Sequence, residues 1–340
     1  MARLHYFRCP SPNFGDELNP WIWPKLLPGL LDDSADELFL GIGTILNDSI
    51  PDAPRKIVFG SGYGYGQPPR IEPEKWRIHC VRGPLTAKAL GLPAALAVCD
   101  PAILLRRMPW PRVDEQYPIS YMPHWESLDS GHWQLACAEA GIHFIDPTGP
   151  VEHVIAQLRA SGLLITEAMH GAITADALRI PWIAVQPQLH MHSPKWLDWC
   201  ASVDVVHQPH ELKASGYKEF FNARYRLARE RIDRGTRAVA GLLGHSTAGR
   251  RPQTAVAGQG PEALSPPPVK RPAAAARATV QNALARRLDP RFIRAAAGDL
   301  RRIAHAPPTL SRDTTIERVT QRLEEQLTIL RAELAAGLSK

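Results

Sequence analysis

The chain has 340 residues, 44% of them hydrophobic and 22% charged, a composition that suits about two globular domains and excludes a largely disordered protein. The net charge of +6 is confined to the C-terminal part: residues 215–340 hold 23 Lys and Arg against 11 Asp and Glu, and residues 1–214 hold 17 against 23. Five scattered cysteines and no long apolar run exclude a disulfide framework, a zinc site, a membrane span and a secretion signal, so we expect a cytoplasmic protein without a metal.

Residues 1–110 repeat one pattern, in which a short apolar segment is followed at once by Gly, Asn, Asp or Arg and then by a helical stretch. Such alternation predicts a parallel α/β sheet, with the loops gathered at its carboxyl edge, where ligands bind. The expected strands are 4–7, 37–40, 56–59, 77–81 and 96–99, and the loops after them contain Asn13-Phe14-Gly15-Asp16, Gly41-Ile42-Gly43, Gly60-Ser61-Gly62, Arg82-Gly83 and Asp100-Pro101.

A second set of strands follows the Pro- and Arg-rich residues 106–112. We expect these strands at 118–122, 143–145, 163–165, 181–185 and 203–206, followed by a helix at 211–243 that packs back across the body. The sequence therefore predicts two Rossmann-like domains, residues 1–110 and 111–245, that face each other across a cleft. Right-handed connections would bring both sets of loops to that cleft.

The C-terminal part reads as an extension of the body. Residues 246–278 are rich in Pro, Ala and Gly without apolar periodicity, which predicts a disordered linker, and we expect a chain that ends at Gly244 to fold alone. Residues 279–340 are predicted to form helices. The first, with arginines beside apolar residues, suits an anionic membrane surface or a partner protein. The second has a leucine stripe that could fold back on the body, pair with a second copy or contact a membrane.

The segment from Leu163 to Val185, LLITEAMHGAITADALRIPWIAV, is the most informative in the chain. Its pattern predicts a buried strand, a helix over 172–178 and a returning strand, with Glu167 and His170 between the first strand and the helix. His170 therefore lies at the carboxyl end of a strand, where helix N-termini present N–H groups to anions. It is either a site residue or a histidine that caps a helix.

Several other residues have both a structural and a functional interpretation. Asp16 could cap a helix over 21–27, and the glycines at 60, 62, 64 and 66 could serve tight turns or close approach to a ligand. Arg82 could be a surface arginine, although a guanidinium at a cleft suits carboxylate or phosphate recognition. His124, His190 and His192 are weaker candidates, because no third metal ligand accompanies them.

Neither a Walker loop, a dinucleotide-binding GxGxxG nor a GxSxG nucleophile motif is present in the required frame. The motifs that are present resemble, in their order and spacing over roughly residues 10–200, the polysaccharide pyruvyl transferase family. These motifs are NFGDELN, GIGTIL, FGSGYGYG, VRGPLTAKALGL, VCDPAILL and ITEAMHGAITADALRIPWIAV, followed by Lys195-Trp196. The chain is most similar to bacterial exopolysaccharide members with Glu-x-Met-His-Gly where others have Ser-x-Arg-Leu-His.

The resemblance implies a fold like that of GT-B glycosyltransferases and transfer of the pyruvyl group of phosphoenolpyruvate onto two sugar hydroxyls, forming a ketal and releasing phosphate. No cofactor beyond this donor is expected. His170 would protonate C3 of the donor. Ala168 stands where many members have an arginine, so Arg82 or Arg106 would supply that cation. The candidate catalytic residues are His170 and Glu167, and the candidate substrate-binding residues are Asn13, Asp16, Gly43, Ser61, Arg82, His124 and Lys195.

The resemblance also implies a lipid-linked oligosaccharide or polysaccharide as acceptor, met at the inner face of the plasma membrane, where a basic helix would give peripheral attachment. Self-association through the C-terminal helix is a further expectation, and a nucleic-acid partner is not expected. Two alternatives stay open. The chain could be a GT-B glycosyltransferase that uses a sugar nucleotide, or an inactive family member retained as a scaffold.

Overall fold

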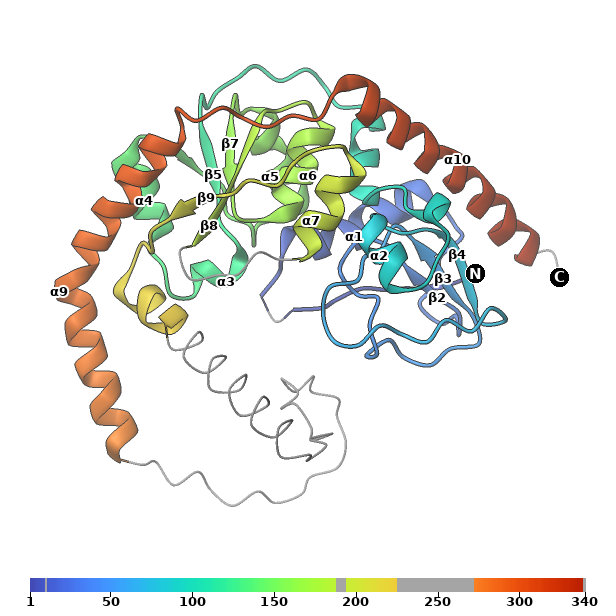
Figure 1. Cartoon of the computed structure of the whole chain (residues 1–340), viewed down its shortest axis with the longest axis horizontal. Helices are drawn as coiled ribbons and strands as arrows, with labels where there is room; N and C mark the ends of the chain where they lie inside the picture. Colours follow the sequence, from blue (N-terminus) through green and yellow to red (C-terminus); the bar gives the residue numbers. More distant parts are fainter. Residues whose placement is uncertain (10, 188–193, 225–271, 339–340) are drawn as a thin grey trace.

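The computed structural model describes residues 1–9, 11–187, 194–224 and 272–338, without the side chains of 187, 272–284, 286, 337 and 338. It is an α/β structure with two parallel sheets and helices beside them (Figure 1). Two long helices from the C-terminal part run along the outside of the molecule. The α/β prediction with two parallel sheets is thereby confirmed.

The first sheet has its strands in chain order, β1-β2-β3-β4, all parallel. Buried residues such as Phe39 and Ile57 pair across it, as expected for a parallel sheet that is covered on both faces. The elements of this half are β1 (Arg3–His5), α1 (Phe14–Leu26), β2 (Leu38–Leu40), β3 (Lys56–Phe59), β4 (Trp76–Cys80), α2 (Pro84–Ala89), η1 (Ala94–Leu96) and η2 (Pro101–Arg107).

The second sheet has the order β6-β5-β7-β8-β9 and is also parallel. The strand order reverses between β5 and β7, and ligands in open α/β sheets bind outside the carboxyl ends at such a reversal. The elements are β5 (Ser120–Met122), α3 (Trp125–Leu128), α4 (Trp133–Ala140), β6 (His143–Phe144), α5 (Val151–Arg159), β7 (Leu164–Thr166), α6 (Met169–Ala177), β8 (Trp182–Pro187), α7 (Pro194–Ser202) and β9 (His210–Leu212).

Two predicted strands are wrong. Residues 96–99 make only a single bridge, Val81 to Ala97, because η1 occupies the preceding residues. Residues 203–206 form no strand, since Asp204 has a left-handed φ of 55° that interrupts an extended chain. The last strand is instead β9, which takes the first residues of the predicted helix at 211–243. The described part of that helix covers 217–224, and the remainder lies outside the described residues.

Helix α1 begins at Phe14 and not at Trp21, so Asp16 lies in its first turn and Asn13 is the N-cap residue. The prediction missed this start because Pro20 lies inside the helix. A proline has no N–H to donate to the carbonyl four residues before it. The side chain of Asn19 supplies a replacement, since its Nδ2 donates to the Asp16 carbonyl at 3.1 Å.

The C-terminal helices are α9 (Pro272–Ile303) and α10 (Asp313–Leu338), so the end of the predicted linker is helical and its remainder lies outside the described residues. Between the helices, Trp182 and Thr309 exchange backbone hydrogen bonds of 3.0 and 2.7 Å. Helix α10 then lies along η2 and β4 of the first half. Its leucine stripe is buried against the chain's own body at Ile316, Val319, Leu323, Leu327, Leu330 and Leu334.

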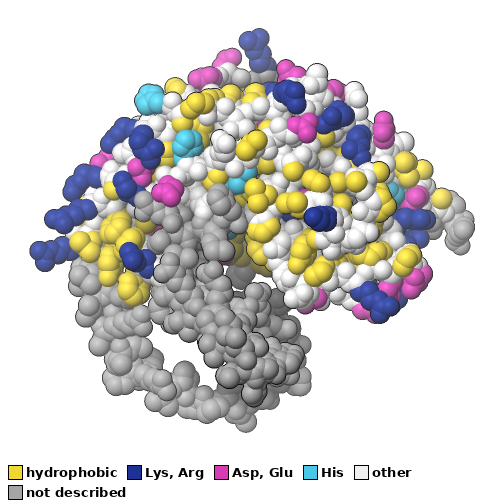
Figure 2. Space-filling model, viewed as in Figure 1, with side chains coloured by type: hydrophobic (Ala, Val, Ile, Leu, Met, Phe, Trp, Pro, Cys, Tyr) yellow, Lys and Arg dark blue, Asp and Glu magenta, His cyan; other side chains and the backbone are white. Residues whose placement is uncertain are grey.

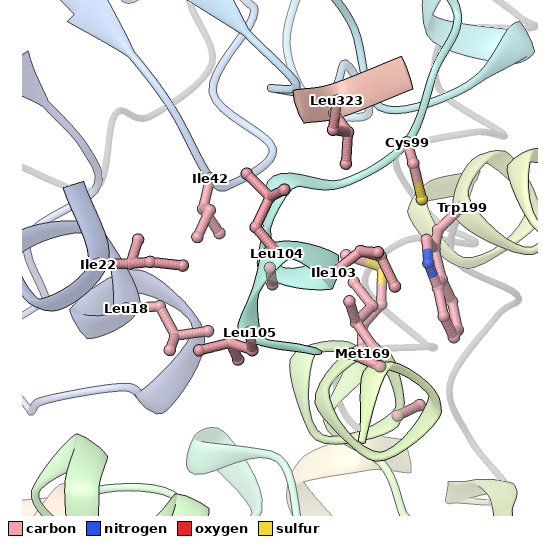
Figure 3. Packing of buried hydrophobic residues seen from close by; sticks show 14 of the residues in the cluster. Leu18, Ile22, Ile42, Cys99, Ile103, Leu104, Leu105, Met169, Trp199 and Leu323 are labelled. Atoms are coloured by element: carbon pink, nitrogen blue, oxygen red, sulfur yellow. The ribbon is translucent and has the colours of Figure 1, made fainter. Parts of the chain in front are cut away.

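One hydrophobic core joins both halves and α10 (Figure 3). Leu18 and Ile22 of α1, Ile103 of η2, Met169 of α6 and Leu323 of α10 belong to it. A body ending at Gly244 would expose the apolar surface that α10 covers. The expectation that such a body folds alone stays a prediction. The leucine stripe, through which we expected self-association, is covered by the chain's own body.

Replacing Leu323 with Ala should lower the free energy of unfolding by about 2–5 kcal/mol, since it leaves a cavity in this core. Leu323 is 0% exposed. Ile329→Ala on the same helix is the matched control. Because Ile329 is 47% exposed, its replacement should lower the free energy of unfolding far less. Urea unfolding of the full chain measures both. Equal, small losses would show that α10 is not part of the core.

Candidate functional site

The loops at the carboxyl edge of the first sheet contact the second half directly. The Phe14 N–H, at the start of α1, donates to the Pro147 carbonyl at 2.8 Å. Beside it, Gly15 lies against the His170 ring so closely that a Cβ at position 15 would stand 2.1 Å from His170 Nδ1. Only a residue without a side chain leaves room for the imidazole here. The N-terminus of α1 and that of α6 thus meet at His170.

His170 is in the first turn of α6, and 12% of its side chain is exposed. Its Nε2 faces Oδ2 of Asp100 at 3.4 Å. Asp100 is fully buried in the loop before η2, where its Oδ1 accepts the Ala102 N–H at 3.0 Å. His170 Nε2 and Asp100 Oδ2 have no hydrogen-bond partner among the described residues. The second histidine nitrogen, Nδ1, lies at the Gly15 side of the ring.

Asp16 is the acidic group on the other side of this contact. Asn13 Nδ2 donates to its Oδ2 at 2.6 Å, and Gly43 lies beside it, since a Cβ there would be 3.8 Å from Asp16 Oδ1. Burial raises the pKa of Asp16, and the hydrogen bond from Asn13 and the nearby charges of His170 and Lys195 partly oppose that rise. The charges of His170 and Lys195 are thus close enough to affect the protonation of Asp16.

The glycine-rich segment after β3 passes near Lys195. Gly64 approaches the Cβ of Lys195, and the Lys195 Nζ lies 5.9 Å from the ring centre of Tyr65. Gly60 has a left-handed φ of 79°, and a Cβ there would meet the ring of Pro101. Ser61 is fully buried and its hydroxyl donates to the Gly41 carbonyl. The predicted turn occurs at Gly60, and the groups close to Gly60 and Gly64 belong to the protein. Close approach of these glycines to a ligand stays a prediction.

Arg82 is 0% exposed and is held entirely by protein groups. Its Nε donates to Asp198 Oδ2 at 3.1 Å and its Nη1 to Thr44 Oγ1 at 2.7 Å. Asp198, in α7, also accepts the backbone N–H groups of Leu85 and Thr86. The buried pair joins β4 to α7, and removing either partner would leave the other charge uncompensated. In this arrangement the guanidinium is enclosed, and its predicted role in holding an anion stays a prediction.

Glu167 faces away from His170, into the core of the second half. Its Oε1 accepts the Tyr121 hydroxyl, and its Oε2 accepts the Ser127 hydroxyl at 2.6 Å and the His124 N–H at 3.4 Å. Burial raises its pKa above the usual range for a carboxyl. Burial and the nearby Glu167 raise the pKa of Glu219 to about 8. The carboxylate that faces His170 is that of Asp100, not that of Glu167.

A family profile described as polysaccharide pyruvyl transferase matches residues 10–188, more than half of the chain. The chain belongs to the polysaccharide pyruvyl transferase family. This member is 41% identical over 214 residues to the succinoglycan biosynthesis protein ExoV of Rhizobium meliloti (strain 1021), with 62% of this chain and 68% of that protein covered. No solved structure matches.

In this member of the family the predicted residues separate into groups. Asn13, Asp16 and Gly43 gather near His170, with Lys195 close by. Arg82 and Ser61 bind other protein groups, and Glu167 accepts a hydrogen bond from the backbone of His124. Sequence reasoning missed Gly15 and Asp100 as site residues, although both stand in loops that it had placed at the carboxyl edge.

The two weaker histidine candidates, His190 and His192, lie outside the described residues. Among the residues that are described, no group of three or more His, Cys, Asp or Glu side chains could hold a metal ion. Within the same described residues, no helix has the length and apolar character needed to cross a membrane.

Proposed function

We propose that this chain transfers the pyruvyl group of phosphoenolpyruvate onto two hydroxyls of a sugar in an exopolysaccharide repeat unit, forming a ketal. The observation that carries the proposal is the meeting of His170 with Asp16 and Lys195 at the paired N-termini of α1 and α6 in a member of this family. Succinoglycan biosynthesis, in the name of its relative, supports a polysaccharide acceptor.

The reaction needs one acid and one base at the start. His170 gives a proton to C3 of the donor while a sugar hydroxyl oxygen bonds to C2, and that hydroxyl releases its proton to the Asp16 carboxylate. The C2–O bond to phosphate then breaks, with the electron pair leaving on phosphate, and the proton held by Asp16 passes to the phosphate oxygen. A second sugar hydroxyl bonds to C2, and its proton restores the charged form of His170. Atoms and protons balance without a further reactant.

The donor carries a phosphate and a carboxylate, so the site must offer positive charge. Lys195 supplies one cation beside Asp16. The N-cap residue of helix α6 is Ala168, and no side chain caps the helix, so the N–H groups of its first turn can bind an anion. These groups take the place of the arginine that many family members have at Ala168. The proposal therefore assigns anion binding to Lys195 and the start of α6, and not to the enclosed Arg82.

Incubation with phosphoenolpyruvate labelled with ¹³C at C3 and with the lipid-linked oligosaccharide fraction of the host cell tests the function. The expected product shows the label as a methyl carbon on the glycan, with one phosphate released per methyl formed. Intact phosphoenolpyruvate together with consumption of uridine or guanosine diphosphate sugars would make the protein a glycosyltransferase. If neither reaction occurs, the result favours a scaffold.

The proposal also places the enzyme at an anionic membrane surface, where a lipid-linked acceptor is held. Arg287, Arg291 and Arg294 are exposed and follow one another about one turn apart on α9. They form no ion pair within the described part of the chain. Lys and Arg side chains line the side of the molecule on which α9 lies (Figure 2). Such a row attracts acidic phospholipid headgroups.

Replacing these three arginines with Gln should weaken binding to phosphatidylglycerol vesicles by roughly 100-fold, since each charge near such a surface contributes a factor of about five. The matched control removes the exposed charges of Arg3, Arg70 and Lys88, which lie in the first half. Vesicle co-sedimentation at low salt measures both variants, with phosphatidylcholine vesicles as the uncharged reference. Equal losses in the two variants would show that α9 is not the contact surface.

A further inference from the structure

Asp100 is a buried carboxylate with one oxygen used and one unused. Its Oδ1 caps η2 by accepting the Ala102 N–H, and its Oδ2 has no hydrogen-bond partner in the described structure. Buried carboxylate oxygens normally accept a hydrogen bond, because one left without a donor has lost its hydration with nothing to replace it. The cap alone therefore does not account for an aspartate at this position.

The group in front of the unused oxygen is His170 Nε2, at 3.4 Å. That nitrogen is itself buried and without a hydrogen-bond partner. A small movement would bring the two atoms to hydrogen-bond distance, and catalytic hydrogen bonds are often long before substrate binds. Because Nε2 is buried, the exposed 12% of the side chain belongs to its other atoms. Of the two ring nitrogens, Nδ1 is the one that does not face Asp100, and it lies at the Gly15 side.

We propose that Asp100 is a positioning residue that accepts the His170 Nε2–H, so that the imidazole delivers its proton to the donor from Nδ1. This inference rests on the proposed function. The Nδ1–H bond breaks as the C3–H bond forms, using the electron pair of the C2–C3 double bond, and the Nε2 proton stays between His170 and Asp100. The carboxylate fixes the ring orientation and stabilises the charged imidazole that must form before each transfer.

The charged groups near His170 set the sign of the pH effect. Asp100, at 3.4 Å, and Asp16 are the acidic groups near the ring, and Lys195 is a basic group beside Asp16. An acid catalyst is lost as pH rises and the ring gives up its proton. Removing the Asp100 charge makes that loss occur earlier, so the fall in kcat/KM on the alkaline side should move to lower pH.

Asp100→Asn tests the inference, because the amide oxygen can keep the cap to Ala102 while the NH₂ group faces Nε2. Turnover of phosphoenolpyruvate should fall by roughly 10²–10⁴-fold in kcat with little change in KM. The alkaline fall should move to lower pH, and ¹⁵N NMR should report the neutral ring of His170 changing from Nε2–H to Nδ1–H. Asp32→Asn is the matched control, since Asp32 accepts the Ser34 N–H at 2.9 Å in the same i to i+2 arrangement.

The NMR measurement separates this inference from the proposed function, because it needs no turnover. An unchanged tautomer and an unchanged pH profile in Asp100→Asn would overturn the positioning role. A tautomer change in a protein that never consumes phosphoenolpyruvate would support the pairing and reject the proposed reaction.

Discussion

A chain with Gln in place of His170 should lose roughly 10²–10⁴-fold in the rate of pyruvyl transfer, the usual contribution of a positioned general acid. Glutamine fills much of the same space but has no proton to give at neutral pH. The unused Asp100 oxygen would then face an uncharged amide. Phosphate release from phosphoenolpyruvate in the presence of acceptor measures the loss, and binding of the donor should be nearly unchanged.

His143→Gln is the matched control for that experiment. His143 is a half-buried histidine of β6 that stacks on Tyr117 and bonds Gln157 at 2.7 Å. That variant should keep its activity. If His170→Gln stayed folded and retained near-normal phosphate release, His170 would have no part in proton transfer.

Gly15→Ala should reduce turnover by about 100-fold, because a displacement of the order of 1 Å in a catalytic group can cost that much. The new Cβ would stand 2.1 Å from His170 Nδ1 and 2.7 Å from its Cγ, so the imidazole must move. Position 15 lies in the first turn of α1 without a positive φ, so the backbone itself accepts alanine. The loss should therefore appear in activity far more than in the free energy of unfolding.

Gly298→Ala is the control for this substitution. Gly298 is also helical, in α9, and a Cβ there meets nothing within 4 Å. It should leave activity unchanged and stabilise the helix by roughly 0.5–1 kcal/mol. Full activity in Gly15→Ala would mean that the ring of His170 is not held where its Nδ1 must act.

Much of the fold follows from local patterns in the sequence. The buried runs around Leu38, Ile57 and Ile165 predict their strands within one or two residues, because parallel strands covered on both faces are continuously apolar. The position of His170 after β7 follows from the same pattern. The helical stripe of α10 was also visible, but not the surface it covers, since only tertiary contacts place it on η2 and β4.

The partners of charged side chains could not be predicted in this way. Arg82 meets Asp198 across 116 positions of sequence, and Asp100 meets His170 across 70, so neither pair has a local signal. Glu167 is a neighbour of His170 in sequence, but its carboxylate binds Tyr121 and Ser127, whereas His170 faces Asp100. Gly15 is required by its contact with the His170 ring, and the sequence alone does not show this contact.

Calorimetric titration of the full chain with phosphoenolpyruvate, and separately with uridine and guanosine diphosphate sugars, tests the central claim most directly. We expect phosphoenolpyruvate to bind with one site per chain and Lys195→Gln to weaken that binding by roughly 10–100-fold, as the loss of a charged hydrogen bond should. The sugar nucleotides should give no heat of binding. Binding of a sugar nucleotide with none of phosphoenolpyruvate would contradict the assignment of the donor and with it the roles of His170 and Asp16.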